Sequence, residues 1–320
     1  MEKNELKPAF EERIRKLLKD EADFKEFVKI ANTPPVNSIR CNTLKITPEK
    51  LKQRLEKKGW KIKQPFNEHP EIMIIESNLL PGEIGRAIEH MLGYYYVQEI
   101  SSMLPVLALK PKENETILDL CAAPGSKTTQ IAAEMKNTGT LIANEISIGR
   151  IKILANNTEK CGVTNTIITR KDGTELCERL KNNGIEFDKI FLDAPCSGEG
   201  TLRSSVKTAI MWNINTIRSM SKLQKALFES AFEVLKVGGE ILYSTCTHAP
   251  EENEEIVNFA LEKFKGRIKI EIISLPIKCR PGVVSWQDKT YSNEVKASCR
   301  IYPQDNNTEG FFLAKFKKIK

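Results

Sequence analysis

The sequence predicts an α/β protein with a seven-stranded, mostly parallel sheet and a small α+β domain before it. From residue 115 onward, short apolar segments alternate with longer amphipathic ones, as strands and helices do around a parallel sheet. Several apolar segments end in polar residues or in a Pro-Gly break, which is typical of the ligand-binding edge of such a sheet. The elements before residue 81 follow a different order, so they are expected to form a separate domain.

The first 80 residues predict a mainly helical start followed by a small β-α-β-β unit. Apolar residues at helical spacing predict a helical region over residues 8–30, which ends at Thr-Pro-Pro. Residues 36–43 are expected to form a strand. Thr47 as N-cap, Pro48 in the first turn and Gly59 at the end predict the following helix, and residues 60–63 and 71–75 two further strands. This order is that of a partial RNA-recognition (RRM-like) fold, without the aromatic strands that stack bases in complete ones.

The larger domain contains the seven predicted strands. They cover residues 117–121, 140–145, 166–172, 188–193, 240–246, 269–275 and 310–316, with helices over 147–161, 213–235 and 251–264 among the intervening segments. We therefore predict three parts. Residues 1–80 form the N-terminal domain, 81–112 a connecting region packed on the next domain, and 113–320 the sheet domain.

Composition restricts the environment and the chemistry. No apolar segment approaches a membrane span, and the start of the chain lacks the apolar region of a signal peptide, so we expect a cytoplasmic protein that does not bind membranes. The eight cysteines form no C-x-x-C motif, so no metal site is predicted, and a disulfide framework is not expected.

Positive charge gathers near the N-terminus. The chain carries a net charge of +7, and the segment from Arg40 to Lys63 holds nine Lys or Arg residues against two Glu. Such a segment favours contact with an RNA backbone, although a solvated helix face would have the same composition. We expect four further lysines near the C-terminus to contribute to RNA binding: Lys315, Lys317, Lys318 and Lys320.

The turn after the first sheet strand is the first candidate ligand site. The segment reads L-D-L-C-A-A-P-G-S-K-T-T, which is a strand, a tight turn and a helix start. Small residues allow a ligand to approach the backbone, and the helix start offers N–H groups. The candidate residues are Cys121, Ala122, Ala123, Pro124, Gly125, Ser126 and Lys127. A plain strand-to-helix turn has the same pattern, and the dinucleotide and phosphate-loop motifs are both absent.

Acids at the ends of the next two strands make a nucleoside site the better interpretation. Glu145 follows Gly125 by 20 residues, where an acid binds ribose hydroxyls, and Asp172 ends the third strand, where it suits an exocyclic amine. Such a site holds a nucleoside without gripping phosphate. It therefore favours S-adenosylmethionine over a nicotinamide dinucleotide.

Two further strands each end in a motif with a cysteine. The fourth strand ends in D-A-P-C-S-G-E-G-T, with Asp193 and Cys196, and the fifth in Y-S-T-C-T-H, with Cys246. A single buried cysteine is usually structural. Two at adjacent strand ends beside an acid favour covalent chemistry, because a thiolate is a strong nucleophile.

These motifs together resemble the Nol/Nop/Sun (NSUN-type) family of RNA cytosine-5 methyltransferases, and in particular its archaeal-type tRNA and rRNA members. The segments S-I-R-C-N-T-L-K, Y-Y-V-Q-E-I-S-S-M-L-P and T-E-G-F-F-L-A-K are also similar to family segments, so the resemblance covers most of the chain. It implies a Rossmann-like class I S-adenosylmethionine-dependent methyltransferase fold. The chain departs from the family at Glu145, where many members have Asp, and at Gln304, where members often have His.

The resemblance also implies roles for individual residues. Cys246 would attack carbon 6 of cytosine, Cys196 would assist release of the product, and Asp193 would hold ring nitrogen 3 of the base while lying near the methionine end of the cofactor. Lys127 would pair with Asp193. Arg150 matches a family position beside the cofactor, although a surface helix arginine is an equally simple interpretation.

The identity of the RNA stays open at this point. We predict tRNA, because the compact N-terminal domain has no long extension, with rRNA as the alternative and a monomer as the functional form. Two other hypotheses are an RNA-binding ribosome-assembly factor with a vestigial site and a DNA cytosine methyltransferase. The presence of both cysteines, Asp193 and Lys127 counts against a vestigial site.

Overall fold

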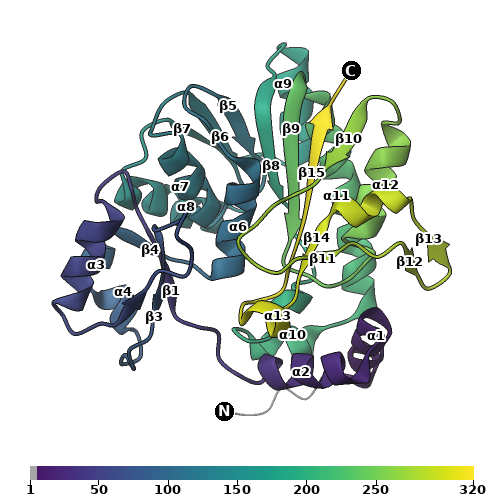
Figure 1. Cartoon of the computed structure of the whole chain (residues 1–320). Helices are drawn as coiled ribbons and strands as arrows, with labels where there is room; N and C mark the ends of the chain where they lie inside the picture. The colour runs from purple at the N-terminus through teal and green to yellow at the C-terminus, as the bar shows by residue number, and fades with distance from the viewer. Residues whose placement is uncertain (1–5) are drawn as a thin grey trace. The chain divides into compact units, whose positions relative to one another are not determined.

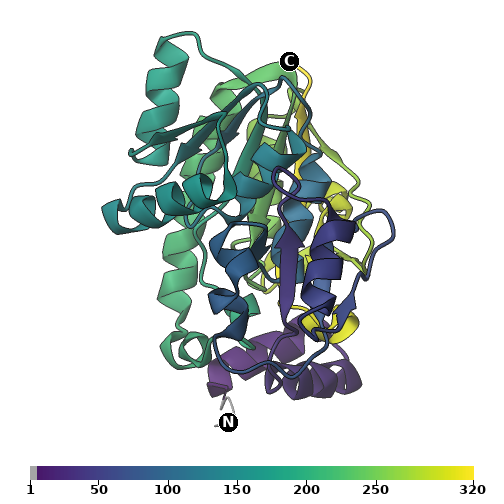
Figure 2. The ribbon, with the colours of Figure 1, turned by 90° about the vertical axis from the view of Figure 1, so that its left-hand side faces the viewer.

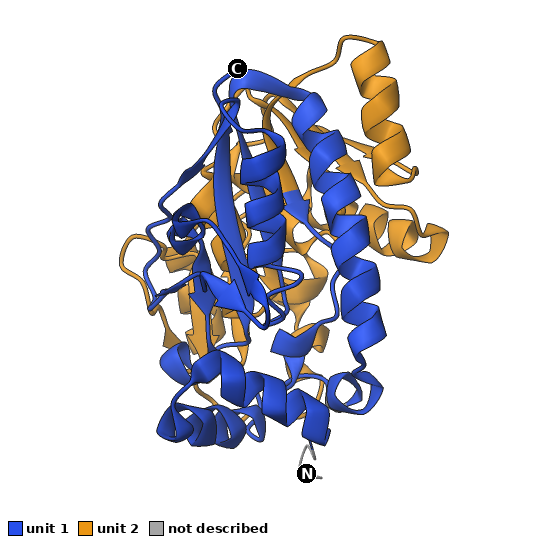
Figure 3. Ribbon diagram, turned by 90° about the vertical axis from the view of Figure 1, so that its right-hand side faces the viewer, with its two compact units in different colours: residues 1–35, 192–320 blue, residues 36–191 orange. Residues whose placement is uncertain are grey.

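The computed structural model describes residues 6–320 and divides into two compact units (Figure 3). The central unit comprises residues 36–191, and the terminal unit comprises the chain up to residue 35 together with residues 192–320. The first five residues, on which the expectation of no signal peptide partly depends, lie outside the described part. The domain boundaries expected at residues 80 and 112 rest on the order of the predicted elements along the chain. These boundaries stay a prediction.

The central unit begins with a four-stranded antiparallel sheet in the order β2-β3-β1-β4. Helix α3 lies beside this sheet (Figures 1 and 2). The elements are β1 (Ser38–Cys41), α3 (Pro48–Glu56), β2 (Ile62–Lys63), β3 (Ile72–Ile75), α4 (Glu83–Arg86), α5 (Ile88–Met91) and β4 (Tyr95–Val97). The β-α-β-β order matches the expectation. The fourth strand was missed, because residues 95–97 pair with β1 instead of serving only as a connection.

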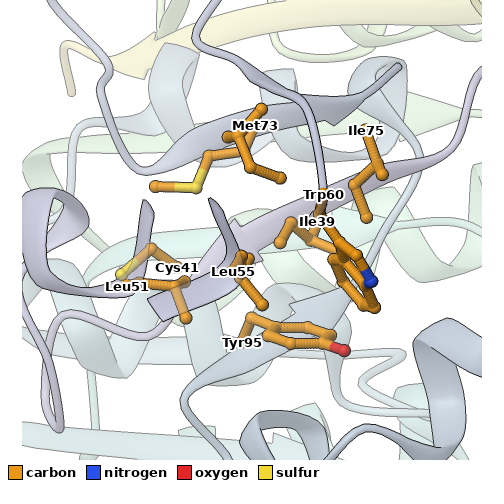
Figure 4. Close-up of a cluster of buried hydrophobic side chains, with 9 residues drawn as sticks. Ile39, Cys41, Leu51, Leu55, Trp60, Met73, Ile75 and Tyr95 are labelled. Carbon is orange, nitrogen blue, oxygen red and sulfur yellow. The ribbon is translucent and has the colours of Figure 1, made fainter. Parts of the chain in front are cut away.

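One apolar cluster holds this small sheet to its helix (Figure 4). Leu51 and Leu55 of α3 are four residues apart, so they lie on one face of the helix, and both are fully buried. They meet Trp60 and residues of all four strands, including Ile39 and Tyr95. Tyr95 is fully buried, so its ring packs in this core and is not available to stack on a base.

The second part of the central unit is a parallel sheet in the order β8-β5-β6-β7. Its elements are α6 (Ile100–Leu109), β5 (Thr116–Asp119), α7 (Ser126–Glu134), β6 (Thr140–Asn144), α8 (Ile148–Cys161), β7 (Thr166–Thr169), α9 (Gly173–Asn182) and β8 (Phe187–Asp193). The last two residues of β8 belong to the terminal unit. Because the four strands are parallel, all their carboxyl ends lie at one edge of the sheet.

The strands of the terminal unit pair in antiparallel fashion, in the order β11-β14-β15-β9, with β10 also on β15. Long helix α11 lies beside them (Figure 3). The main elements are α1 (Pro8–Leu18), α2 (Glu21–Ala31), α10 (Val206–Met211), α11 (Ile214–Glu233), β9 (Leu235–Thr245), α12 (Glu254–Lys263), β10 (Ile268–Glu271), β14 (Cys299–Ile301), α13 (Pro303–Asn306) and β15 (Phe311–Lys318). The short ones are the 3-10 helices η1 (Glu199–Thr201) and η2 (Asn293–Ala297) and strands β11 (Arg280–Pro281), β12 (Ser285–Trp286) and β13 (Lys289–Thr290).

Aromatic side chains form the core between α11, α12 and the antiparallel strands. Phe228 contacts Phe316 edge-on at 5.0 Å between ring centroids, and Phe232 stacks on Phe264 at 3.9 Å. All four rings are fully buried. Burying apolar area of this size is the main stabilising contribution in such a core.

All seven predicted sheet strands are present, and three local expectations need correction. The helical region over residues 8–30 is two helices, because Lys19 ends α1 with a left-handed backbone (φ 62°) and Asp20 caps α2. Strand β9 begins at Leu235, five residues before the expected start. The structure also contains one disulfide, Cys279–Cys299, where reduced cysteines were expected. The antiparallel pairing of β11 with β14 brings these Cα atoms to 5.4 Å, which a separation of 20 residues does not reveal.

No helix among the described residues is long and apolar enough to cross a membrane.

Candidate active site

The turn between β5 and α7 has a shape that requires glycine. Gly125 has φ +101°, and a Cβ atom there would lie 3.0 Å from Cδ1 of Leu154. Its N–H donates to the carbonyl of Ala122 at 2.8 Å, which closes the turn. Ala122 and Ala123 are buried against Ala143 and Leu154. The backbone at this strand end is therefore fixed and free of bulky side chains.

Glu145 follows β6 at the same edge of the sheet. Its carboxylate is only 3% exposed, accepts from the Ser147 N–H at 2.8 Å and pairs with Arg150 at 3.0 Å. Arg150 also donates to the carbonyl of Ala123. Arg150 thus joins the turn after β5 to the acid after β6, although its side chain is 53% exposed on the surface of α8.

Asp172 caps helix α9 after β7. Its Oδ1 accepts from the backbone N–H of Thr174 at 2.9 Å, from the Thr174 hydroxyl at 2.5 Å and from the Glu175 N–H. The hydrogen bond from the Thr174 side chain, aided by the two backbone N–H groups, lowers the pKa of this carboxyl although burial opposes the shift. Asp172 is therefore an ionised acceptor near neutral pH.

Three of the cations expected to bind RNA are engaged inside the fold. Arg40 is 2% exposed and donates to side chains and to a backbone carbonyl of the central unit. Lys315 pairs with Glu240 at 3.0 Å, and Lys318 donates to the carbonyls of Phe232 and Leu235. For Arg40 the expectation is wrong, because a buried side chain does not offer its charge to a partner; for Lys318, which is partly exposed, it stays a prediction. Gln304 likewise binds a residue of its own chain, Asp23, at 3.0 Å.

The terminal unit brings the two motif cysteines together. Sγ of Cys196 and Sγ of Cys246 lie 3.2 Å apart, within hydrogen-bond distance for two sulfur atoms. Both side chains are partly accessible, whereas Cys41, Cys161 and Cys177 are buried. The two cysteines come from two separate strand ends. The Ala194 N–H donates to the Ser244 carbonyl at 2.9 Å, and this hydrogen bond aligns the start of the Cys196 motif with the Cys246 motif.

The environment of Cys196 favours its protonated form. The hydrogen bond with Cys246, followed by burial and by the nearby negative charges of Cys246 and Glu252, holds the pKa of Cys196 well above its usual range. Cys196 therefore holds its proton more firmly than an exposed cysteine does, and the two sulfur atoms are close enough to share a hydrogen bond. That arrangement suits Cys246 as the nucleophile.

A buried group of hydroxyls and carboxyls surrounds the two cysteine motifs, and the sequence did not indicate it. Glu252, fully buried, accepts from the Ser197 N–H at 3.0 Å and from the Ser197 hydroxyl. The Ser197 hydroxyl also lies 2.8 Å from that of Thr247, which contacts Glu199 at 3.3 Å. Ser197 follows Cys196 and Thr247 follows Cys246, so this network ties both cysteine loops to two acids. The adjacent acids in S-G-E-G and P-E-E-N-E were the only signal.

Burial governs both acids of this network. It raises the pKa of Glu252 to about 7, with the bonds from Ser197 and Gln224 opposing the shift only in part. It also raises the pKa of Glu199, which accepts from the indole N–H of Trp212 at 2.7 Å. These acids therefore hold protons more readily than exposed carboxyls do.

Three loops meet backbone to backbone beside Cys246. The Gly200 N–H donates to the Cys246 carbonyl at 2.8 Å, and the Gly310 N–H donates to the Gly200 carbonyl at 2.9 Å. A Cβ atom at Gly200 would lie 2.3 Å from the carbonyl oxygen of Gly310. The motifs S-T-C-T, S-G-E-G and T-E-G-F are thus joined at a point where only glycine fits.

Asp193 ends β8, and its Oδ1 accepts from the Ser244 hydroxyl at 2.7 Å. Lys127 lies in the first turn of α7, in the central unit. The expected pair between Lys127 and Asp193 would join the two units, and it stays a prediction.

Two family descriptions match the chain. The one described as 16S rRNA methyltransferase RsmB/F matches residues 106–317, and the N-terminal domain of 16S rRNA methyltransferase RsmF matches residues 6–100. The chain belongs to the RsmB/F methyltransferase family. The predicted membership of the Nol/Nop/Sun group of RNA cytosine-5 methyltransferases is confirmed, and so is dependence on S-adenosylmethionine.

Two relatives differ in the RNA that their names give. The chain is 42% identical over 296 residues to a tRNA (cytosine(49)-C(5))-methyltransferase of Pyrococcus abyssi, covering 92% of each. It is 38% identical over 309 residues to ribosomal RNA small subunit methyltransferase F of Vibrio cholerae, which covers 96% of the chain but only 62% of the Vibrio protein.

Solved structures agree with the fold. A methyltransferase homolog from Pyrococcus horikoshii superimposes with a TM-score of 0.80 at 31% identity, covering 98% of this chain and all of that one. NSun6 from the same organism gives 0.81 at 25% identity, with 98% of both chains covered. The predicted fold class is therefore confirmed, a methyltransferase α/β fold with a separate N-terminal part.

The strand ends of the central unit fit S-adenosylmethionine. The turn at Gly125 leaves backbone open beside two buried alanines, and Glu145 and Asp172 place carboxylates after the next two strands. This set of acceptors suits hydroxyl and amino groups rather than phosphate. We refer to residues 121–127, Glu145 and Asp172 as the cofactor edge.

Proposed function

We propose that this chain methylates carbon 5 of a cytosine in tRNA through a covalent bond between Cys246 and carbon 6 of the base. The observation that carries the proposal is the Cys196–Cys246 pair at 3.2 Å, with its buried acids. A single thiol would suffice for attack alone. A second thiol, which keeps its proton while the first attacks, is what a reaction with a separate release step requires.

The cofactor edge would hold S-adenosylmethionine through residues already fixed by the fold. Glu145, held by Ser147 and Arg150, would accept from the ribose hydroxyls. The three hydrogen bonds to Asp172 all use Oδ1, so Oδ2 would accept from the adenine amine. Residues 121–127 would cradle the remainder, with Asp193 near the methionine end. When bound, the cofactor supplies an electrophilic methyl group.

In the first step, the Cys246 thiolate forms a bond to carbon 6 of cytosine. The electron pair of the carbon 5–carbon 6 double bond shifts, so carbon 5 becomes an enamine-like nucleophile. Asp193, oriented by Ser244, would hold or supply a proton at ring nitrogen 3 and neutralise the charge that develops there. Lys127 would order this carboxylate.

The same sulfur pair explains how Cys196 becomes a base at the right time. The bond and charge of the Cys246 thiolate are main reasons for the raised pKa of Cys196. Once Cys246 is bonded to carbon 6, that thiolate charge is gone, and Cys196 loses its proton more easily. After methyl transfer it can take the carbon-5 proton, directly or through water. The double bond then re-forms, and the Cys246 sulfur leaves with its electron pair.

Replacing each cysteine tests these roles. Cys246→Ala is expected to lower the methylation rate by at least about 10³-fold, since it removes the nucleophile. Cys196→Ala is expected to accumulate a covalent RNA–protein adduct, visible on a denaturing gel and absent from the double variant. Cys177→Ala, which alters a buried cysteine in α9, is the matched control. An active Cys246→Ala enzyme would overturn the assignment.

The tRNA proposal is supported by the Pyrococcus abyssi relative, which this chain matches over 92% of both lengths. The Vibrio relatives and the family description keep small-subunit rRNA as the second candidate. Bisulfite sequencing of total RNA from cells lacking the gene distinguishes them, because the lost cytosine signal identifies both molecule and position. We further infer that the enzyme is cytoplasmic and that it acts as a monomer. Analytical ultracentrifugation of the purified protein, with and without its RNA, tests whether it is a monomer.

A further inference from the structure

A cavity of about 350 Å³ in the terminal unit, lined by polar side chains together with Met211 and Trp212, begins at the residue after Cys196. Its walls include Ser197, Ser205, Lys207, Thr208, Trp212 and Asn213. Its volume falls within the range of small-molecule sites. None of the described residues that line it is acidic.

The cavity adjoins the hydrogen-bonded network of hydroxyls and acids behind Cys196 and Cys246, which we call the cysteine cluster. Ser197 is bonded to Thr247 at 2.8 Å and to Glu252, so the wall shares the network behind both cysteines. Trp212 donates to Glu199 of the same network, and its ring meets Phe10 edge-on at 5.6 Å. Its indole is therefore held in place, which an aromatic surface for stacking requires.

We infer that this cavity binds the nucleotide next to the target cytosine in the RNA strand. Lys207 is exposed and would contact the phosphate that the two nucleotides share, the hydroxyl and amide groups would bind the ribose, and Trp212 would contact the base. One cation, several neutral hydrogen-bonding groups and one aromatic ring match the parts of a ribonucleotide. The inference depends on RNA methylation by this chain but not on which RNA is methylated.

Charge removal at the cavity tests the phosphate contact. Lys207→Ala is expected to raise KM for the substrate RNA by roughly fivefold with little change in kcat, and to lower the slope of log affinity against log salt by about 0.7. Lys222→Ala removes the same charge from an exposed position of α11 and is the control. Equal KM and equal slope in the two variants would overturn the inference, whereas a wild type that methylates no RNA would overturn the proposed function instead.

Photo-crosslinking gives a second measurement that does not depend on catalysis. The substrate RNA carries 4-thiouridine at one nucleotide on either side of the target, and the crosslinked peptide is identified by mass spectrometry. A crosslink within residues 205–216 from one of these positions is expected. Crosslinks from both positions that all fall elsewhere in the chain would contradict the inference.

An independent observation concerns Arg40, which is buried in the central unit. Its guanidinium donates to the Ser126 carbonyl at 2.6 Å, to the Thr129 hydroxyl at 2.8 Å, to Gln130 at 3.3 Å and to Gln98. No carboxylate of the described residues lies within ion-pair distance of it. Burial lowers the pKa of Arg40 to about 10, so the group is still charged at neutral pH. A buried cation held by neutral acceptors is costly, and three of the four acceptors lie in one short segment, residues 126–130.

That segment is the start of helix α7, which follows the cofactor turn. Thr129, which accepts from Arg40, itself donates to the carbonyls of Gly125 and Ser126 at 2.8 and 3.0 Å. Arg40 and Thr129 therefore restrain the backbone from Gly125 to Ser126 from two sides. We propose that Arg40 is a positioning residue for S-adenosylmethionine, acting through this backbone, and not an RNA contact. This proposal depends on the cofactor edge assigned above.

Binding measurements separate positioning from RNA contact and from simple stability. Arg40→Met is expected to raise the Kd for S-adenosylmethionine roughly tenfold by calorimetry, with the salt dependence of RNA binding unchanged. The control is Arg54→Met. Arg54 lies in the same unit and pairs with Glu89, so its replacement should leave cofactor affinity unchanged. Arg40→Lys is expected to restore part of the affinity.

If Arg40→Met does not fold, Thr129→Val provides the test, since it removes the hydroxyl that links Arg40 to Gly125. It should weaken cofactor binding in the same direction. Unchanged cofactor affinity in a folded Arg40→Met protein, or in Thr129→Val when that is the folded variant, would overturn the proposal.

Discussion

The cofactor edge of the central unit and the cysteine cluster of the terminal unit hold their carboxyl groups in opposite ways. Asp172 caps a helix, and hydrogen bonds from Thr174 and Glu175 lower its pKa. Glu252 is fully buried, and burial raises its pKa to about 7. The first arrangement suits an acceptor that stays ionised to bind a ligand, and the second suits a group that can hold or release a proton near neutral pH.

This difference matters because the two regions have different tasks. Binding a nucleoside requires acceptors whose charge does not change during the reaction. Moving a proton from carbon 5 requires groups whose protonation can change, and Cys196, Glu252 and Glu199 all have raised pKa values. The predictions that follow test this contrast.

Glu252→Gln should give the largest change in how stability depends on pH. Because the folded pKa lies above the unfolded value of 4.5, the native state binds the extra proton, and stability falls as pH rises from about 4.5 to 7. Between these two pKa values the loss is roughly 3 kcal/mol. The amide cannot ionise, so the variant should be more stable than wild type at pH 8 in urea unfolding, although methylation becomes slower.

The control is Glu255→Gln, three residues further along the chain, in the first turn of α12. Bonds from Lys225 and Lys289 lower the pKa of Glu255 although burial opposes them. Its contribution to stability is therefore present above the unfolded pKa and lost as the solution is acidified through the folded pKa, so this variant should be less stable than wild type at neutral pH. If Glu255→Gln and Glu252→Gln shift stability in the same direction at pH 8, the contrast between buried and paired acids is wrong.

Asp172 variants should give a smaller effect, located in cofactor affinity. Asp172→Asn keeps a good N-cap residue, so helix α9 should be retained, but the ionised acceptor is lost. We expect S-adenosylmethionine affinity to fall about tenfold, which is about 1.4 kcal/mol. Asp172→Ala should lose the cap as well and unfold about 1 kcal/mol more easily. A cofactor Kd unchanged in Asp172→Asn would remove Asp172 from the site.

The smallest expected change is in the reactivity of Cys196. In Cys246→Ala the bond and charge of the neighbouring sulfur are missing, so the pKa of Cys196 should fall. Alkylation of Cys196 with iodoacetamide, followed by peptide mass spectrometry, should then reach half its maximal rate at a lower pH than in wild type. A midpoint that stays the same or rises would show that Cys246 does not hold the proton on Cys196.

Most of the fold and the chemical residues of the site could be predicted from the sequence. Strand ends and motifs are local, because alternation of apolar segments and the chemistry of a turn are written in neighbouring residues. Thus β5 with its turn, and the motifs that end in Cys196 and Cys246, are found where they were expected. Strand β4 was missed, since a three-residue strand takes its structure from pairing with β1.

Charge was the weakest guide. Arg40 was counted as an RNA contact by composition, yet it is engaged inside the protein. Whether a cation faces solvent or backbone carbonyls depends on which strand or helix packs over it, and composition does not contain that information.

The chemistry follows from local sequence patterns: a nucleoside-binding turn, strand-end acids and two cysteines in motifs of an RNA cytosine-5 methyltransferase family. How these groups behave depends on the tertiary fold. It placed Cys196 3.2 Å from Cys246, buried Glu252 behind Ser197 and directed Arg40 to the cofactor turn. Distances between residues 50 to 90 positions apart, and the burial that changes their pKa values, arise from packing and cannot be read from local patterns.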